Sequence, residues 1–258
     1  MKVHTVCNEA MRNILQHHSH SFVGYLTAGY PDEESFLRIV RNCEERGLHI
    51  FEIGYPSQNP YLDGDVIRNA HAAVQPGLRT DLDFWKRLRE TISAPIWLMG
   101  YTADLVDSGM YRKLAELGYI DALVIPDIDH KRRIALKKEM EPLGVEVLGF
   151  TCHSNDPQQI HESLETYSLI YQQLYSGPTG IQNTSEDYLE LLTQSRKESN
   201  ARLFAGFGIG TPERARELLQ HGFDGVIIGT AIMKQLNQSE EDLYQFVGKL
   251  AETVEEVK

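Results

Sequence analysis

The sequence predicts an α/β protein made of a single (β/α)8 barrel, the TIM-barrel fold, over residues 1–258. Two observations predict it. Short apolar runs alternate with amphipathic stretches along the whole chain, and eight such pairs within 258 residues match the usual size of this barrel. The spacing is also too regular for two unrelated domains, and no linker or low-complexity tract divides the chain.

The expected strands are short runs rich in β-branched and aromatic residues, bounded by glycine, proline or polar turns. After the first of them, Phe36, Ile39, Val40 and Cys43 recur at helical spacing and predict one buried helix face. Two later helical stretches, ADLVDSGMYRKLAELG and TPERARELLQHG, end in glycine, a common residue just beyond a helix. A short helix is expected before the first strand, and the acidic segment 239–258 is expected to form a final outer helix. The eight predicted strands are residues 21–29, 50–54, 95–101, 121–127, 145–150, 168–173, 201–208 and 224–229.

Composition and charge argue against several classes of protein, namely those that bind nucleic acid, are secreted or span a membrane. The formal net charge of −12 disfavours a nucleic-acid partner, because neutralising phosphates requires clustered lysine and arginine. The first residues lack an apolar core of signal-peptide length, and no apolar run approaches the roughly 20 residues that span a bilayer. Cys7, Cys43 and Cys152 are scattered and form no CxxC pair, as expected of reduced thiols. We therefore expect a cytoplasmic protein that contacts neither nucleic acid nor membrane.

An open doubly wound sheet is the main alternative fold. The segment GFGIGTPE follows a predicted strand and opens a helix, as a dinucleotide-binding fingerprint does. That fingerprint requires the first strand of the sheet and an acidic residue at the end of the next strand. Here the segment follows the seventh strand, and Asp224 begins the next strand instead of ending it. The barrel remains the better prediction.

Glycine-rich turns follow predicted strands six, seven and eight, and barrels of this kind bind phosphate at strands seven and eight. In GFGIGTP (206–212), small residues let backbone N–H groups approach a ligand, with Thr211 as the N-cap and Pro212 as the first residue of the next helix. The turn after strand six is SGPTG (176–180). The alternative is that these glycines only satisfy tight turns.

The turn after strand eight also opens a helix. In IIGTAIMK (227–234), Gly229 and Thr230 begin a short helix whose positive dipole end would face an anion. The absence of a lysine from the glycine-rich turns favours binding through backbone groups. The sequence therefore predicts a small phosphorylated molecule as the ligand.

Polar residues at strand ends are candidate functional groups, because the loops after the strands form the active face of a barrel. Glu52 lies between Phe51 and Ile53, so its side chain points the opposite way from theirs, and one of the two directions is the crowded barrel interior. Burial there would raise its pKa toward neutrality, so that it donates as well as accepts a proton. Asp63, on the following loop, would stay ionised, and two carboxyl groups with separated pKa values form an acid–base arrangement. Alternatively, Glu52 pairs with a basic residue and Asp63 only ties its loop, and spacing does not decide between the two. The other candidates at strand ends are Tyr101, Asp127, His153 and Tyr171.

Other patterns carry weaker hypotheses. The run HHSH (17–20) could bind a metal, but a polar turn before the first strand is the better interpretation, because no ligand geometry is established. Glu52, Asp127 and His153 could form a metal site at the strand ends, although ligand types alone are weak evidence. Cys152 is expected to be structural, because neighbours on a strand face opposite sides and it therefore points away from His153. We expect no metal and no cofactor.

In these motifs the sequence resembles the tryptophan synthase α subunit family. EIGYPSQNPYLDGDVI is similar to the family signature E-L-G-x-P-F-S-D-P-x-A-D-G-P-x-I. FVGYLTAGYP, LMGY and VIPD are similar to its first, third and fourth strands, and SGPTG, GFGI and GTAIMK to its substrate and phosphate turns. The order and spacing of the motifs agree over nearly the whole chain.

The resemblance implies a lyase of tryptophan biosynthesis, which cleaves indole-3-glycerol phosphate by a retro-aldol reaction to indole and glyceraldehyde 3-phosphate. It implies Glu52 as the general acid and base, Asp63 as the group that binds the indole N–H and stabilises the protonated ring, and Thr179 as the support of Asp63. It raises a PLP-dependent tryptophan synthase β subunit, in an α2β2 complex, as a candidate partner. It assigns Gly180, Gly208, Gly229 and Thr230 to the phosphate, and Tyr25, Met99, Tyr101 and Tyr171 to the indole pocket.

Three loops depart from the family pattern. Residues 57–59 (SQN) replace F-S-D and remove an acidic residue used in loop closure and subunit communication. Tyr175 stands in place of the arginine of S-R-x-G-V-T-G, and residues 29–31 (GYP) replace G-D-P. These changes suggest lyase chemistry with altered gating or partnering. Two alternatives remain: a barrel enzyme that uses the same groups on another phosphorylated aldol or sugar, and a binding protein without turnover, against which the presence of Glu52 and Asp63 argues.

Overall fold

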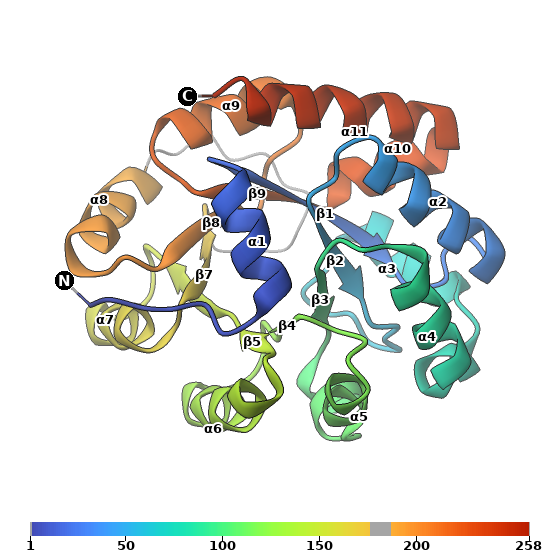
Figure 1. Ribbon diagram of the computed structural model, residues 1–258, viewed down its shortest axis with the longest axis horizontal. Helices are drawn as coiled ribbons and strands as arrows, with labels where there is room; N and C mark the ends of the chain where they lie inside the picture. Colours follow the sequence, from blue (N-terminus) through green and yellow to red (C-terminus); the bar gives the residue numbers. More distant parts are fainter. Residues whose placement is uncertain (1, 176–186, 258) are drawn as a thin grey trace.

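Parallel strands and helices alternate around a ring in the computed structural model, which describes residues 2–175 and 187–257 (Figure 1). Within these residues the strand order is β5-β4-β3-β2-β1-β9-β8-β7-β6, and each pair of neighbours is parallel. Each predicted strand coincides with one or more observed strands, so the eight strand predictions are confirmed. The described strands are β1 (Ser21–Thr27), β2 (Ile50–Gly54), β3 (Ile96–Met99), β4 (Ala122–Val124), β5 (Glu146–Val147), β6 (Gly149–Cys152), β7 (Leu169–Gln173), β8 (Arg202–Gly206) and β9 (Gly225–Ile228).

The strands β5 and β6 are two halves of one bent strand, separated only by Leu148. The first half pairs with β4 and the second half pairs with β7. The backbone N–H of Leu148 donates to the carbonyl of Leu123 on β4 at 3.0 Å, so the bend occurs without breaking the ladder. One chain segment thus joins the two ends of the sheet. The barrel is closed with eight strands, and the predicted (β/α)8 fold is confirmed.

Helices surround the barrel, and α1 lies across the end that faces the viewer in Figure 1. Met11 on α1 is fully buried among Val23, Ile50 and Trp97, which point into the amino-terminal half of the barrel. The indole N–H of Trp97 contacts Met11 Sδ at 3.1 Å. Among the described residues, this packing closes the amino-terminal end of the barrel interior.

The described helices and single turns follow the strands in the expected alternation. They are α1 (Glu9–His17), α2 (Glu33–Glu45), α3 (Asp65–Ala73), η1 (Pro76–Thr80), α4 (Leu82–Thr91), η2 (Thr102–Val106), α5 (Met110–Glu116), α6 (His130–Met140), η3 (Glu141–Leu143), α7 (Pro157–Thr166), α8 (Tyr188–Glu198), α9 (Pro212–Gln220), α10 (Thr230–Gln238) and α11 (Glu240–Glu255).

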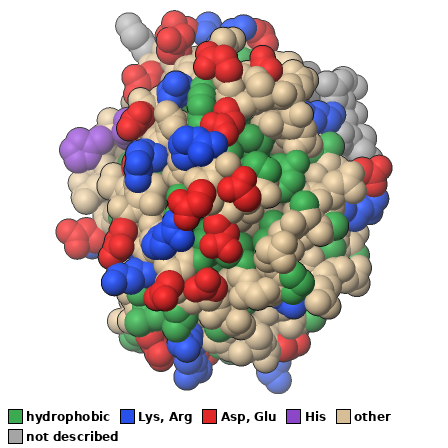
Figure 2. Space-filling view, turned by 90° about the vertical axis from the view of Figure 1, so that its right-hand side faces the viewer, with side chains coloured by type: hydrophobic (Ala, Val, Ile, Leu, Met, Phe, Trp, Pro, Cys, Tyr) green, Lys and Arg blue, Asp and Glu red, His purple; other side chains and the backbone are tan. Residues whose placement is uncertain are grey.

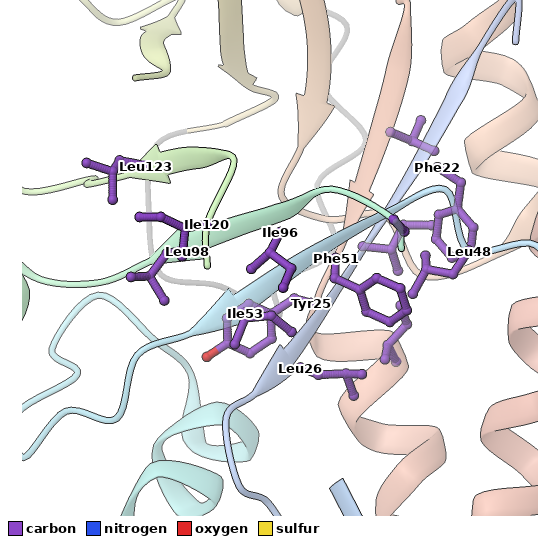
Figure 3. Close-up of a cluster of buried hydrophobic side chains, with 14 of the residues drawn as sticks. Phe22, Tyr25, Leu26, Leu48, Phe51, Ile53, Ile96, Leu98, Ile120 and Leu123 are labelled. Atoms are coloured by element: carbon purple, nitrogen blue, oxygen red, sulfur yellow. The ribbon is translucent and has the colours of Figure 1, made fainter. Parts of the chain in front are cut away.

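Alternation along the strands divides the core into two layers. On β1, Val23 packs inside the barrel, whereas Phe22 and Leu26 pack in the outer layer. Tyr25, near the carboxyl end of β1, contacts the outer cluster and also lines the cavity described below. Figure 3 shows outward side chains of β1, β2 and β3 gathered in one cluster with Leu48. The predicted apolar face of α2 is fully buried in this outer layer, as Phe36, Ile39, Val40 and Cys43 show.

Most charged side chains of the described residues lie outside these layers, whereas Glu52, Asp63, Arg133 and Glu146 are buried. Figure 2 shows acidic and basic side chains interleaved on the face at the right of Figure 1. Arg38 on α2 pairs with Glu240 on α11 at 2.5 Å, and Arg87 on α4 pairs with Glu34 on α2. Such exposed pairs add little stability each, so burial of the two apolar layers is the main source of stability. In the part of the chain that the structure describes, no helix has the length and apolar character to cross a bilayer.

Candidate active site

A cavity of about 220 Å³ opens at the carboxyl ends of the strands, opposite the end that α1 closes. Most residues predicted from the sequence line it, which brings the carboxyl groups and two glycine turns together. The predicted residues in its wall are Tyr25, Glu52, Asp63, Met99, Tyr171, Gly208, Gly229 and Thr230. Thr179 and Gly180 lie outside the described residues.

Glu52 is held inside the barrel by the alternation of β2, since Phe51 and Ile53 point outward. Its side chain is 4% exposed, yet it lines the cavity. Burial, with the nearby charge of Asp63 as the smaller cause, raises the pKa of Glu52 from 4.5 to about 8. The predicted shift toward neutrality is therefore present. At neutral pH this carboxyl group is mostly protonated, and it can both give and take a proton.

Asp63 lies on the loop between β2 and α3 and is 2% exposed. The hydroxyl of Tyr101, at the end of β3, donates to Asp63 Oδ2 at 2.7 Å. Tyr101 Oη also accepts from the N–H of Leu62 at 3.3 Å, so Tyr101 holds both the side chain and the backbone of this loop. Burial raises the pKa of Tyr101 above its usual value, with Asp63 as a further cause, and the hydroxyl remains a donor. Tyr101 thus fixes Asp63 rather than forming part of the cavity wall.

Two tyrosines occupy space that glycines leave open. A Cβ atom at Gly54 would lie 2.2 Å from Tyr25 Oη, and one at Gly206 would lie 2.1 Å from a ring carbon of Tyr171. The ring of Tyr171 is stacked on Phe150 with centroids 5.2 Å apart. Burial raises the pKa of both tyrosines well above the usual value, so they remain uncharged. The wall near the carboxyl groups is therefore aromatic and suits a flat apolar ring.

The turns after β8 and β9 form the other side of the cavity. Gly208 has a φ of 73°, and Phe207 before it has a φ of 74°, an uncommon conformation for a residue with a side chain. Gly229 precedes α10, whose N-terminus has no side-chain cap, and Thr230 is its first residue. Uncapped N–H groups and the helix dipole favour an anion here.

Lys234 and Gln235 also line the cavity, although neither was predicted from the sequence. Lys234 follows Thr230 by four residues on α10, so the two share one helix face. That spacing was a usable signal, because Lys234 stands within the motif IIGTAIMK. The preference for binding through backbone groups rested on the absence of a lysine from these turns, yet the exposed side chain of Lys234 also lines the cavity.

Some candidates do not reach the site. Asp127 accepts from the N–H and the hydroxyl of Thr102, both at 2.9 Å, and it does not line the cavity. His153 is exposed and lies 3.8 Å from Asp187. The alternative of a metal site formed by Glu52, Asp127 and His153 therefore receives no support from the described residues, because only Glu52 of the three faces the cavity.

The run HHSH contributes to a different cluster. Among the described residues, the one group of three potential metal ligands is His18, His49 and Glu255. His18 precedes β1, His49 precedes β2, and Glu255 ends α11, so the group lies at the amino-terminal end of the barrel, away from Glu52. His49 Nδ1 accepts from the backbone N–H of Phe22 at 3.2 Å, so in the neutral ring the proton lies on Nε2, the atom that faces Glu255. This tautomer offers no lone pair to a metal, and the cluster does not fit a metal centre.

Tyr175, which replaces the arginine of the family pattern, is 5% exposed. Its ring stands perpendicular to that of Phe207, with centroids 5.8 Å apart. It supports the strained turn before Gly208 by an apolar contact.

Comparison with known proteins identifies the family. The family model for the tryptophan synthase alpha chain matches residues 11–258. The tryptophan synthase alpha chain of Dehalococcoides mccartyi is 30% identical over 245 residues, which cover 91% of this chain and 95% of that protein. The alpha chain of Geobacter sp. is 30% identical over 247 residues, which cover 91% of this chain and 92% of that protein.

Solved structures agree on the fold. A protein of Aquifex aeolicus has a TM-score of 0.84 at 25% identity, over 98% of this chain and 100% of its own. The tryptophan synthase structure of Mycobacterium tuberculosis has a TM-score of 0.83 at 23% identity, over 96% of this chain and 98% of its own. The chain therefore belongs to the tryptophan synthase alpha chain family, which consists of lyases that cleave indole-3-glycerol phosphate in tryptophan biosynthesis.

Proposed function

We propose that Glu52 and Asp63 together carry out the cleavage of indole-3-glycerol phosphate in this chain. The observation that carries the proposal is the Glu52 carboxyl group, buried in the cavity wall with a pKa of about 8. An ordinary glutamate would be ionised at neutral pH and unable to donate a proton. The raised pKa supplies an acid where the reaction needs one.

One titrating group, Glu52, can carry out both proton transfers of the cleavage reaction. Protonated Glu52 gives its proton to C3 of the indole ring, which becomes a cation centred on the ring nitrogen. The Asp63 carboxylate accepts a hydrogen bond from that nitrogen and stabilises the cation. Ionised Glu52 then takes the proton of the glycerol hydroxyl next to the scissile bond, and the bond breaks with its electron pair returning to the ring. Indole and glyceraldehyde 3-phosphate result, and Glu52 is protonated again.

The other wall of the cavity fits the phosphate group. The N-terminus of α10 and the turn at Gly208 present backbone N–H groups, Thr230 adds a hydroxyl, and Lys234 adds a positive charge at the mouth. An anion held at this wall would direct the ring of the substrate toward Tyr25 and Tyr171. This arrangement orients the reacting carbon toward Glu52.

Purified protein is expected to convert indole-3-glycerol phosphate to equal amounts of indole and glyceraldehyde 3-phosphate. Because the described residues place no metal-ligand cluster near Glu52, a chelator should leave the rate unchanged. Stopped-assay quantification of both products tests this. Turnover of another phosphorylated aldol or sugar, with none of the indole compound, would favour the alternative barrel enzyme. Binding without turnover of either would favour the non-catalytic alternative.

We also propose a cytoplasmic location and a PLP-dependent β subunit as a partner. Mutual activation is known for the tryptophan synthase α2β2 complex of Pyrococcus furiosus, and a chain of that complex shares this fold at a TM-score of 0.76. In this chain the loop after β2 is held by two contacts: Ser57 Oγ donates to Asp104 at 2.5 Å, and Asp104 pairs with Arg79 at 2.9 Å. Residues 58–59 carry no charge.

A β subunit from another organism is therefore expected to raise the turnover of this chain less than it raises the turnover of its own α subunit. A partner accelerates cleavage only by favouring a closed state, and the usual charged contacts of the loop are changed. Steady-state kinetics with and without the foreign β subunit measures the ratio. Full activation would mean that the changed loops 57–59 and Tyr175 are neutral for partnering.

A further inference from the structure

His71 on α3 is buried at 4% exposure and does not line the cavity, yet it hydrogen-bonds to two segments that form it. Its Nδ1 atom lies 3.2 Å from the backbone nitrogen of Ser57, on the loop that carries Asp63. Its Nε2 atom lies 3.2 Å from Tyr25 Oη. The role proposed above for the carboxyl groups does not use this histidine.

The hydrogen bonds have a fixed direction. A backbone N–H can only donate, so Nδ1 accepts from Ser57, and the proton of the neutral ring lies on Nε2, which donates to Tyr25. Burial lowers the pKa of His71 to about 4, so the ring stays neutral near pH 7. Tyr25 Oη can then donate to Thr27 Oγ1, at 3.3 Å. The chain of bonds runs from the loop, through the helix, to β1.

This chain of bonds links the strand next to Glu52 with the loop that carries Asp63, and Tyr25 lies near both carboxyl groups, whose charges add to burial in raising its pKa. Tyr25 pairs in register with Glu52 on the neighbouring strand, and both side chains face the cavity. Ser57 lies on the loop between β2 and α3 that carries Asp63, and its hydroxyl donates to Asp104. A shift of His71 would therefore move the wall beside Glu52 relative to the loop of Asp63.

We propose that His71 is a positioning residue that sets the separation of the Glu52 and Asp63 carboxyl groups, by holding Tyr25 with Nε2 and the Ser57 backbone with Nδ1. The inference rests on the proposed function of the two carboxyl groups. We expect His71 to affect the rate of cleavage and not phosphate binding. Its two hydrogen bonds go to Tyr25 and Ser57, whereas the phosphate turns follow β8 and β9.

The first test is His71→Leu, which removes both bonds. We expect kcat to fall on the order of 10- to 100-fold, because reacting groups misplaced by about an ångström lose that much. Affinity for glycerol 3-phosphate, measured by calorimetry, should change less than about 2-fold, since the helix-terminus site is intact. The matched control is His49→Leu, which removes a buried histidine whose Nδ1 also accepts a backbone N–H, at the closed end of the barrel. It should lower the melting temperature but keep kcat.

The second test separates the two bonds. His71→Gln keeps an N–H near the position of Nε2, whereas His71→Asn keeps only an acceptor near the position of Nδ1. Tyr25→Phe should lower kcat about 5-fold in the wild-type background, the value of one hydrogen bond. We expect the same loss in the His71→Gln background and a smaller loss in the His71→Asn or His71→Leu background, where Tyr25→Phe removes only the bond to Thr27. Equal loss in all four backgrounds would show that Tyr25 and His71 act independently, and would overturn the proposal.

Nitrogen-15 NMR of the histidine ring checks the same bonds without turnover. The proton of His71 is expected on Nε2, with a resonance that moves in Tyr25→Phe and stays in the control Tyr244→Phe, whose hydroxyl bonds to Glu240 on α11. A proton on Nδ1 would overturn the inference. A wild-type protein without cleavage activity would reject the proposed function and this inference with it, whereas normal kcat in His71→Leu would reject the inference alone.

Discussion

Replacing Glu52 with glutamine is expected to abolish cleavage and to stabilise the protein at alkaline pH. Glutamine keeps the shape of the side chain but cannot transfer a proton, and loss of such a group costs about 10²- to 10⁴-fold in rate. Affinity for glycerol 3-phosphate should be retained, because the turns at Gly208 and Thr230 are unchanged. Steady-state assay of indole release measures the loss.

The stability effect follows from the same pKa. The pKa of Glu52 is about 8 in the folded protein and 4.5 as the ordinary value, so between these pH values the folded state binds more protons than the unfolded state. The free energy of unfolding of the wild type therefore falls as pH rises from about 4.5 to 8, on the order of a few kcal/mol in total. Glutamine does not titrate, so the variant should melt at a higher temperature than the wild type at pH 8, and by a smaller margin at pH 5.

Glu146→Gln is the control for both measurements. Glu146 is another buried carboxyl group, 2% exposed, on β5, and it accepts from the hydroxyl of Ser168 at 2.6 Å. It does not line the cavity, so the variant should keep its turnover. More than a few per cent of wild-type activity in Glu52→Gln would remove the acid–base role from Glu52.

The second large effect is expected from Thr230→Glu, which should abolish binding of glycerol 3-phosphate. A carboxylate at the first residue of α10 would occupy the helix N-terminus and repel the phosphate. The helix itself should persist, because an acidic residue in the first turn interacts favourably with the dipole. Calorimetry measures the binding, and circular dichroism checks the fold.

Two further variants calibrate this result. Gln238→Glu adds the same charge at the other end of α10, on an exposed side chain, and should leave binding unchanged. Lys234→Met should weaken binding without abolishing it, and more so at low ionic strength, because its charge is exposed to solvent. Undiminished affinity in Thr230→Glu would move the phosphate site away from this turn.

Most of the fold could be predicted from local patterns in the sequence. Short runs rich in β-branched and aromatic residues predicted the strands, and the spacing of Phe36, Ile39, Val40 and Cys43 predicted the buried face of α2. The N-cap at Thr211, whose side chain accepts from the N–H of Arg214, and Pro212 as the first residue of α9 are likewise present. These features depend on neighbours in the sequence, which is why a single chain suffices to predict them.

Contacts between distant segments were harder to foresee. The bend at Leu148 depends on pairing with two different neighbouring strands, and Gly149 beside it is a local signal of a bend that the strand predictions did not use. Burial of Glu52 was predicted from its place on the strand, but the bond from Tyr101 to Asp63 and the bridge through His71 join separate segments. No periodicity encodes such pairs. Asp127 and His153 were singled out at strand ends, yet the side chains turn elsewhere, because a strand end fixes position and not direction.

Gly54 and Gly206, which contact Tyr25 and Tyr171, restrict the order in which these positions can be substituted. Because any β-carbon at Gly54 or Gly206 would overlap Tyr25 or Tyr171, the glycine can change only after the tyrosine has become smaller. Each tyrosine and its glycine therefore behave as one epistatic unit, with a single permitted order of steps. A library that seeks cleavage of bulkier substituted indoles should vary positions 25 and 171 first. Substitutions at 54 and 206, which would disrupt the pocket in the starting protein, would become accessible only in those descendants.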